Sequence, residues 1–452
     1  MYQDKKTLES TILDPVFNIT WRFYLFIAIL FSIVFVGAIA FLYQLRDGLK
    51  VTGLNDRIFW GVYISNFIYF IGVSYSGTLI SAILRLTQAE WRKPITRMAE
   101  VITLIGIIIG FSMIFIDMGR IDRLLVVPIA ARIQSPLFWD FLSVTTYGTG
   151  SFLFLYVPLI PDIALLRDKF NEIPGFSFRK YLYRILALGW HGSQAQKEKL
   201  ERIISILALV LIPVAFTCHT VIAFIFALTW RVGWHSTVFG PYFVAAAVFS
   251  GIAAIMIAMA IFRKLYHLEE YITYIHFRNL GFLLLAFCMG YTYLSLAEYI
   301  TSTYRGALAD LELMEELGFG TYAAYFWSFW MLSLVLPTII LLISCWKYKS
   351  EKAIWASTLA SLFVLIGMWI KRYIIVIPAL ARPFVAEEWT EYSPTWVELS
   401  ITVAAVAGFL IAYAVFSKLF PIISIWELME EEEMKNAETL SKTEKILKES
   451  NK

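Results

Sequence analysis

About ten long apolar runs constrain what this chain can fold into. Each is near or above the roughly 20 residues that a helix needs to cross a bilayer, and backbone groups inside lipid must be hydrogen-bonded within the span. The composition agrees, because 59% of the residues are hydrophobic and only 16% are charged. The sequence therefore predicts an all-α, polytopic membrane protein. The runs lie at about 20–44, 58–86, 95–117, 137–166, 201–229, 238–264, 277–302, 320–346, 353–377 and 396–420.

Basic residues are concentrated in alternate links between these runs. The links at 85–97 and 167–202 are rich in Lys and Arg, whereas the links on the other side hold single arginines such as Arg231 and Arg305. Basic links favour the cytoplasmic side of a membrane, so both termini are expected to be cytoplasmic. No small-residue cleavage motif follows the first run, which is therefore expected to be a retained helix rather than a signal peptide.

Two runs open with the same pattern of glycine and aromatic residues, which predicts two parallel four-helix bundles with one further helix on each side. The expected units are the N-terminal segment with the first helix (1–57), the first bundle (58–229), the second bundle (230–378), an outer loop with the last helix (379–426) and a charged cytoplasmic tail (427–452). The two copies of the pattern are Gly61, Tyr63, Phe70 and Gly72, and Gly240, Tyr242, Phe249 and Gly251.

The link between the third and fourth runs, FIDMGRIDRLLVVPIAARIQSPLFWD, carries ionisable residues at the rim of the membrane. Such groups are unfavourable at membrane depth and usually have a function or a partner. Oxidation of a quinol requires a group that accepts protons, and Asp117 and Asp140 could provide it, with Arg120 as a hydrogen-bond donor. Two structural alternatives remain open, namely an N-cap at Asp140 and a salt bridge from Asp117 to Arg120 or Arg123.

Further polar residues could complete a quinone site or carry protons through the bundles. His235 precedes the sixth run, and Arg372 lies near the outer end of the ninth. Either could face the same pocket, although His235 could equally be a surface residue. The candidates for a proton path are Tyr147, Asp162, His219 and Glu298, each of which could instead be a satisfied core residue or reach water.

Several kinds of redox centre have no ligands in this sequence. Bis-histidine haem sites need facing pairs of histidines at membrane depth, and only His219 lies deep in a run. The cysteines Cys218, Cys288 and Cys345 are scattered singly, so neither an iron–sulfur cluster nor a structural metal is expected. No phosphate loop is present. Electrons would therefore have to leave the chain through a partner, and nothing in the sequence indicates nucleic acid.

Several strings identify a family resemblance that covers about residues 58–420. The strings DMGR, SPLFWD, GWHSTVFGPYFVAAAVFSG, LEEYIT, GMWIKRY and YSPTWVE resemble the polysulfide-reductase-type (NrfD-like) membrane subunits, and most closely the quinol-oxidising membrane subunit of bacterial alternative complex III. The resemblance implies two four-helix bundles and site roles for Arg120, Asp140, His235 and Arg372. Departures from the family pattern occur where His or acidic residues are expected, at Asp117, Arg278, Lys371 and around 381–383.

By this resemblance, the chain is expected to be the quinone-binding subunit of a respiratory oxidoreductase in a bacterial or archaeal cytoplasmic membrane. It would oxidise menaquinol near the outer face and pass electrons to an extrinsic iron–sulfur subunit, beside further membrane and cytochrome subunits, with proton translocation as an added expectation. Alternatives are the quinone subunit of a molybdoenzyme that acts on sulfur compounds, a secondary transporter and a purely structural anchor.

Overall fold

The computed structural model describes residues 11–123, 126–130, 132–172, 178–347, 351–385 and 389–430, and these residues form helices without strands. Within them, ten helices are long and apolar enough to cross a membrane, which confirms the predicted all-α, polytopic fold. The spans are α2 (Trp21–Asp47), α3 (Val62–Leu86), α4 (Thr96–Asp117), α6 (Pro136–Glu172), α8 (Gln194–Ala227), α9 (Phe239–Leu265), α10 (Tyr274–Arg305), α12 (Ala323–Phe329) continued through a π-helical turn (Trp330–Val335) into α13 (Leu336–Lys347), α14 (Glu351–Ala381) and α15 (Trp396–Leu419).

Two links that were expected to be loops contain helices of their own. Between α6 and α8 lies α7 (Phe178–Leu186), and between α10 and α12 lies α11 (Leu308–Gly318). Helix α8 also begins earlier than its apolar run, because Ser193 and Gln196 form a reciprocal capping box at its start. The predicted spans are therefore correct in number and order, while the polar turns that extend them were missed.

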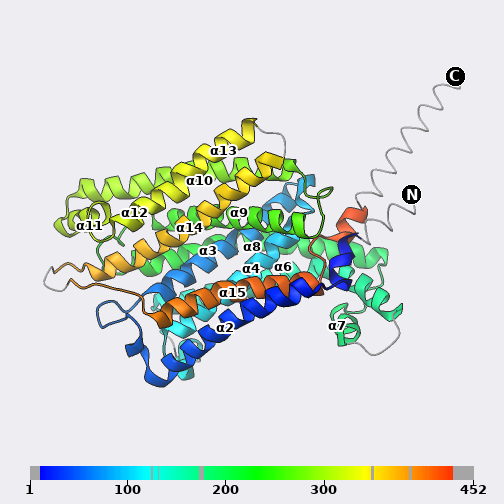
Figure 1. Cartoon of the computed structure of the whole chain (residues 1–452), viewed down its shortest axis with the longest axis horizontal. Helices are drawn as coiled ribbons and strands as arrows, with labels where there is room; N and C mark the ends of the chain where they lie inside the picture. Colours follow the sequence, from blue (N-terminus) through cyan, green and yellow to red (C-terminus); the bar gives the residue numbers. More distant parts are fainter. Residues whose placement is uncertain are drawn as a thin grey trace.

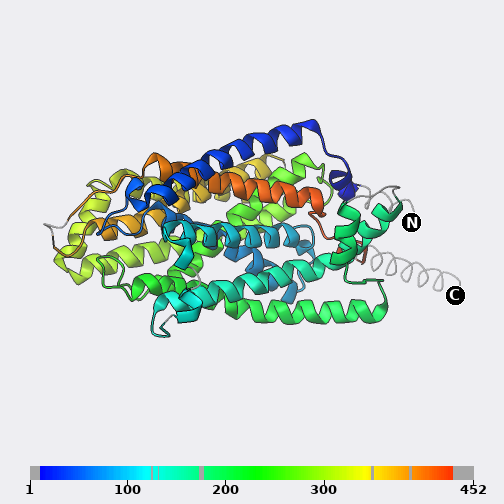
Figure 2. The same ribbon diagram turned by 90° about the horizontal axis from the view of Figure 1, so that it is seen from below.

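The spanning helices pack as two four-helix bundles with a flanking pair (Figures 1 and 2). Helices α3, α4, α6 and α8 form the first bundle, and α9, α10, α12 with α13, and α14 form the second. Helices α2 and α15 pack against each other along one side. Their faces approach closely at Gly37, where an added Cβ would overlap the Cβ of Ala404. This arrangement confirms the predicted architecture, while the exact domain boundaries stay a prediction.

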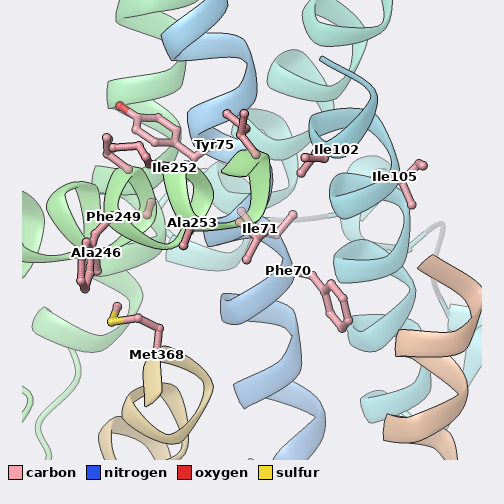
Figure 3. Packing of buried hydrophobic residues seen from close by; sticks show 14 of the residues in the cluster. Phe70, Ile71, Tyr75, Ile102, Ile105, Ala246, Phe249, Ile252, Ala253 and Met368 are labelled. Atoms are coloured by element: carbon pink, nitrogen blue, oxygen red, sulfur yellow. The ribbon is translucent and has the colours of Figure 1, made fainter. Parts of the chain in front are cut away.

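Helices α3 and α9, which open with the repeated pattern, lie against each other at the centre of the molecule. Gly251 of α9 faces Ser76 of α3, and Gly72 of α3 lies against Ser250 and Ala247 of α9. Figure 3 shows Ile71 of α3 between the labelled side chains of α9 and those of α4, whereas Phe70 points away from α9, and its ring lies 6.1 Å from that of Phe409 in α15. Both helices are mostly buried, so the two copies of the pattern form the joint between the bundles.

The outward faces of the spans are apolar and exposed, as expected for surfaces that contact lipid tails. Helix α2 is the clearest case, since most of its large hydrophobic side chains point away from the protein, including Trp21, Phe31 and Phe35. The chain therefore buries α3 and α9 inside protein and leaves α2 as the most lipid-exposed span.

The C-terminal segment after α15 folds back over the end of the first bundle. Glu427 lies 2.9 Å from both Arg85 and Arg92, and all three side chains are largely buried. Most of the predicted charged tail, from residue 431 onwards, lies outside the described residues. The described part of this segment therefore packs against the first bundle as far as Glu427, while the start of the charged tail stays a prediction.

Candidate functional site

Asp140 lies one turn inside α6 and points into the protein. The side chain is buried, and Oδ1 has no hydrogen-bond partner among the described residues. Because α6 begins at Pro136, Asp140 is not the N-cap of this helix, so that alternative is wrong. The carboxylate is close enough to Cys218 of α8 to interact with it electrostatically. An unpaired acceptor at this depth is unfavourable in an apolar environment, which makes it a candidate for binding a donor.

An apolar groove runs between α4 and α6, and its lining on α6 begins at Val144, one helical turn after Asp140. Its volume is about 350 Å³, and it is open along the lipid-facing side. Val144 and Gly148 follow Asp140 at intervals of four residues, so all three lie on the same face of α6. Gly148 widens the groove, because a Cβ there would lie 3.3 Å from Ile107. The lining residues are Leu104, Ile107, Ile108, Phe111, Val144, Thr145, Gly148, Thr149 and Phe152.

His219 occupies the joint between the bundles, at the level of the α3–α9 contact. Its ring lies 4.1 Å from the ring of Tyr75 and 6.5 Å from the ring of Tyr147, measured between centroids. Neither ring nitrogen has a hydrogen-bond partner in the described part of the chain. The guanidinium of Arg372 is close enough to act on His219 electrostatically. The structure therefore brings together three predicted residues, Tyr147, His219 and Arg372.

Arg372 is buried deep in the protein rather than in the outer pocket that the sequence suggested. The guanidinium lies 5.2 Å from the centre of the Phe243 ring, and one of its nitrogens approaches Gly72. Nε and Nη1 have no partner among the described residues. A glycine at position 72 leaves the space that this side chain fills. Arg372 thus stands between the two bundles, with α3 on one side and α9 on the other.

Glu298 belongs to a second buried polar cluster, inside the second bundle. Its Oε2 lies 3.9 Å from Nζ of Lys371, which donates a hydrogen bond of 2.7 Å to the hydroxyl of Tyr299. The ammonium also lies over the ring of Tyr242, whose hydroxyl is 3.1 Å from Ser295. Lys371 stands at the position where the family resemblance predicts an acid, and here it balances the charge of Glu298.

Asp117 and Arg120 point to different surroundings. Asp117 ends α4 facing Tyr63 and Glu398, and its Oδ1 has no partner among the residues that the structure describes. Arg120 is exposed and pairs with Asp122 at 2.7 Å, a hydrogen bond that lowers the pKa of Asp122 from its usual value. Among the described residues, the predicted salt bridge from Asp117 to Arg120 or Arg123 is therefore not found, and Arg120 pairs with Asp122 instead.

His235 is held at the surface of the second bundle by charged neighbours. Its Nδ1 lies 2.9 Å from the carbonyl oxygen of Arg231, and its Nε2 contacts Arg305. Arg305 also pairs with the buried Asp310, which accepts a hydrogen bond from the backbone of Gly233. His235 thus belongs to a cluster that ties the link before α9 to α11, apart from Asp140 and Arg372.

Asp162 is saturated with hydrogen-bond donors at the other end of the first bundle. Its carboxylate accepts from Arg97 at 2.5 Å and from the backbone nitrogens of Ile425 and Trp426. Arg97, which the sequence places in a basic link, is itself buried in α4. Sequence reasoning also missed Glu100, which is buried and accepts a hydrogen bond of 2.6 Å from Ser81. Its position inside an apolar run was the signal that could have identified it.

The described residues contain no group of three or more His, Cys, Asp or Glu side chains that could hold a metal ion. The fit to a quinone is better, because the free Oδ1 of Asp140 can accept a hydrogen bond from a ring hydroxyl and the groove that begins one helical turn after it is apolar.

Comparison with known proteins identifies relatives among the subunits of oxidoreductases. A putative membrane subunit of a dimethyl sulfoxide reductase from Halobacterium salinarum is 27% identical over 57% of this chain and 55% of its own length, so the match spans about half of that relative. A selenate reductase subunit from Mesobacillus selenatarsenatis is 24% identical over 88% of this chain and 94% of its own. An Hdr-like menaquinol oxidoreductase integral membrane subunit from Archaeoglobus fulgidus is 22% identical over 91% of this chain and 97% of its own length.

The family model described as "Polysulphide reductase, NrfD" matches residues 50–385, which include both bundles and the residues Asp117, Asp140, His219, His235, Glu298 and Arg372. The chain therefore belongs to the NrfD polysulphide reductase family of membrane subunits.

Proposed function

We propose that this chain is the quinone-binding membrane subunit of a respiratory oxidoreductase, with the quinol ring beside Asp140. The observation that carries the proposal is the buried, unpartnered Oδ1 of Asp140, one helical turn before Val144, the first residue of α6 that lines the open apolar groove. A quinol has a polar ring and an apolar isoprenoid tail. The carboxylate of Asp140 would bind the ring, and the apolar lining of the groove would bind the tail. The name of the Archaeoglobus relative, a menaquinol oxidoreductase subunit, favours menaquinol as the substrate.

Oxidation of a quinol releases two protons and two electrons to separate acceptors. Asp140 would accept a hydrogen bond from a ring hydroxyl and then its proton, because its free oxygen lies within protein and faces no competing donor. The electrons would pass to a redox centre in a partner subunit at the outer face, since no haem or cluster ligands are recognised in this sequence. An extrinsic iron–sulfur subunit would supply that acceptor.

The identity of the complex is better supported for a reductase than for alternative complex III. Two relatives are named as subunits of dimethyl sulfoxide and selenate reductases. A complex of this molybdoenzyme type consumes electrons at a soluble catalytic subunit, so its membrane subunit would oxidise quinol. This second candidate keeps the quinone site proposed here and changes the terminal acceptor.

The polar residues at the joint between the bundles would give protons a route away from Asp140. Cys218 lies within electrostatic range of Asp140, and the next residue, His219, faces Tyr75 and Tyr147. The hydroxyl of Tyr147 donates to the carbonyl oxygen of Ser74 at 3.2 Å. Farther along α3, Thr78 bonds to Ser151 at 3.2 Å and Ser81 to Glu100 at 2.6 Å. These groups would lead toward the end of the bundle at which Arg85 lies.

The decisive variant is Asp140→Asn, assayed in the intact complex as electron transfer from a menaquinol analogue to the terminal acceptor. Loss of the proton acceptor should lower turnover by about 10² to 10⁴. Asp122→Asn is the matched control, because Asp122 is exposed near the same end of the first bundle, and it should leave turnover unchanged. Full activity of Asp140→Asn in an assembled complex would contradict the site. Quinone-independent transport by the purified chain would instead favour the transporter alternative.

A second variant tests the groove separately from the proton acceptor. Gly148→Leu would place a side chain in the space between α4 and α6, and should raise KM for a quinol with a long tail more than for a short-chain analogue. Gly290→Leu on α10 is the control, because nothing lies within 4 Å of a Cβ at that position. An equal KM for both substrates in the Gly148 variant would show that the tail binds elsewhere.

A further inference from the structure

Helix α7 carries a stripe of exposed apolar side chains that face away from the protein. Phe178, Tyr181, Ile185 and Leu188 are 70%, 59%, 52% and 66% exposed. The spacing of three and four residues places Phe178, Tyr181 and Ile185 on one face of the helix, and Leu188 follows two residues after its end. A stripe of this kind on a short helix outside the ten spans is not explained by packing within the chain.

The opposite face of α7 is fixed to the rest of the protein. Tyr183 is fully buried, and its hydroxyl donates a hydrogen bond of 2.7 Å to the carbonyl oxygen of Leu419, at the end of α15. Arg179 donates to the carbonyl oxygen of Val16 at 3.0 Å. The ring of Tyr183 also lies 5.3 Å from the ring of Phe170 in α6. These contacts set the rotation of α7, so the apolar stripe is held outward rather than exposed by chance.

Helix α7 lies at the end of the membrane-spanning bundles, next to their lipid-facing surface. It follows α6 and precedes α8, at the end of the molecule at which α15 terminates (Figure 1). Lys180 and the exposed Arg184 lie along one edge of the stripe. An amphipathic helix with basic residues beside its apolar face is typical of segments that lie in the plane of a membrane interface. Anionic headgroups complement those charges.

We propose that α7 is an in-plane interfacial helix that inserts this stripe into one leaflet and binds anionic phospholipid headgroups through Lys180 and Arg184. Helices α6 and α8, which precede and follow α7 in the chain, also carry exposed apolar side chains, including Leu209 and Val210 of α8. The inference is independent of the quinone site, because it concerns the opposite end of the first bundle.

The test uses the full chain, with the subunits that co-purify with it, in lipid nanodiscs. Ile185→Cys carries an environment-sensitive fluorophore, and the native cysteines Cys218, Cys288 and Cys345 are buried and should react slowly. The label at position 185 should be quenched by brominated lipid and protected from aqueous iodide. Ala195→Cys is the control, because Ala195 is exposed at the start of α8 and its label should respond mainly to iodide.

Anionic recognition is measured as the ratio of quenching by brominated phosphatidylglycerol to quenching by brominated phosphatidylcholine. Each basic side chain near an anionic surface contributes about a factor of five in binding, so the double variant Lys180→Gln/Arg184→Gln should lower the preference by up to about twenty-five-fold. Lys197→Gln/Lys199→Gln, which changes exposed lysines away from the stripe, should not change it.

Three results would overturn the proposal. Iodide quenching at position 185 equal to that at position 195 would place the stripe in water. An unchanged lipid preference in the Lys180/Arg184 variant would exclude recognition of anionic headgroups. Protection of the label that disappears when the co-purifying subunits are removed would assign the stripe to a protein partner instead.

Discussion

Arg97 and Asp162 form a buried ion pair, with 2.5 Å between Nη1 and Oδ2, at the end of the first bundle that is closed by the C-terminal segment. The same guanidinium nitrogen reaches the carbonyl oxygens of Pro421 and Ile423 at 3.3 and 3.1 Å. Asp162 in turn accepts from the backbone nitrogen of Trp426 at 3.1 Å. The pair therefore fastens residues 421–426 to α4 and α6. Because these donors occupy its carboxylate, we expect Asp162 to stabilise the packing of this segment rather than to carry protons.

The first prediction concerns the two halves of this pair. Arg97→Met and Asp162→Asn should each destabilise the protein by about 3 to 5 kcal/mol, because removing one partner leaves a buried group without compensation. The double variant should lose less than the sum of the two. Thermal unfolding in detergent measures stability, and protease cleavage near Trp426 reports release of the segment. If Asp162→Asn has normal stability but impaired proton uptake, Asp162 carries protons, and the structural role is wrong.

The second prediction concerns the close contact between α3 and α9. A Cβ at Gly251 would overlap the Oγ of Ser76 and lie 2.8 Å from the carbonyl oxygen of Val73, which is backbone and cannot rotate away. Gly251→Ala should therefore destabilise the protein by about 1 to 3 kcal/mol, as measured by thermal unfolding. Gly290→Ala is the matched control, since a Cβ there has open space. Equal melting temperatures for the two variants would show that the bundles separate easily at this joint.

The architecture could be predicted from the sequence because apolar runs and their length depend on local composition alone. The repeated pattern predicted two bundles, but it did not predict that the helices that carry it meet, with Gly72 and Gly251 at the α3–α9 contact. The positions of charged side chains could not be predicted, because a charge near the end of a run can point to water or into the bundle. Arg97 was assigned to a basic link and is buried, whereas Arg120 was assigned to a pocket and is exposed.

The grouping of the polar residues also required the tertiary structure. The sequence places both Arg372 and His235 near the outer membrane face. In the structure, Arg372 lies between the bundles, whereas His235 contacts Arg305 at the surface. No local pattern distinguishes these two cases. The groove near Asp140 was likewise invisible, since it depends on which faces of α4 and α6 meet.

The third prediction separates a quinone-binding role for His235 from a structural one. Asp310 is buried, pairs with Arg305 and accepts a hydrogen bond from the backbone of Gly233, so Asp310→Asn should lower the melting temperature, because it removes the ion pair that ties the link before α9 to α11. His235 is partly exposed, and His235→Ala should have a smaller effect on stability. If His235 also orients the quinone ring, its variant should raise KM for quinol several-fold with an unchanged melting temperature. Loss of the assembled complex in His235→Ala would instead show that the residue acts in packing.

The fourth prediction is a response to acid in the outer segment that follows α14. Burial raises the pKa of Glu316, but the backbone hydrogen bond from Thr321 and the charge of Arg382 outweigh it, so the pKa lies below the usual 4.5. The carboxylate lies 3.4 Å from Arg382, whose Nη1 donates to the carbonyl oxygen of Thr390 at 2.9 Å. Glu316 thereby connects α11 to the chain after α14.

The sign of the effect follows from the lowered pKa. A carboxylate with a lower pKa in the folded state stabilises it fully above the unfolded pKa, and this contribution is lost as the pH falls through the folded value. Hydrogen exchange at Thr390, whose nitrogen donates to the carbonyl oxygen of Ala381, should therefore quicken as the pH falls below about 4.5, after correction for the intrinsic exchange rate. Glu316→Gln should exchange faster at neutral pH and lose this acid step, whereas Glu315→Gln, on the exposed face of α11, should keep it. The same acid step in Glu316→Gln would mean that a different carboxylate controls the segment.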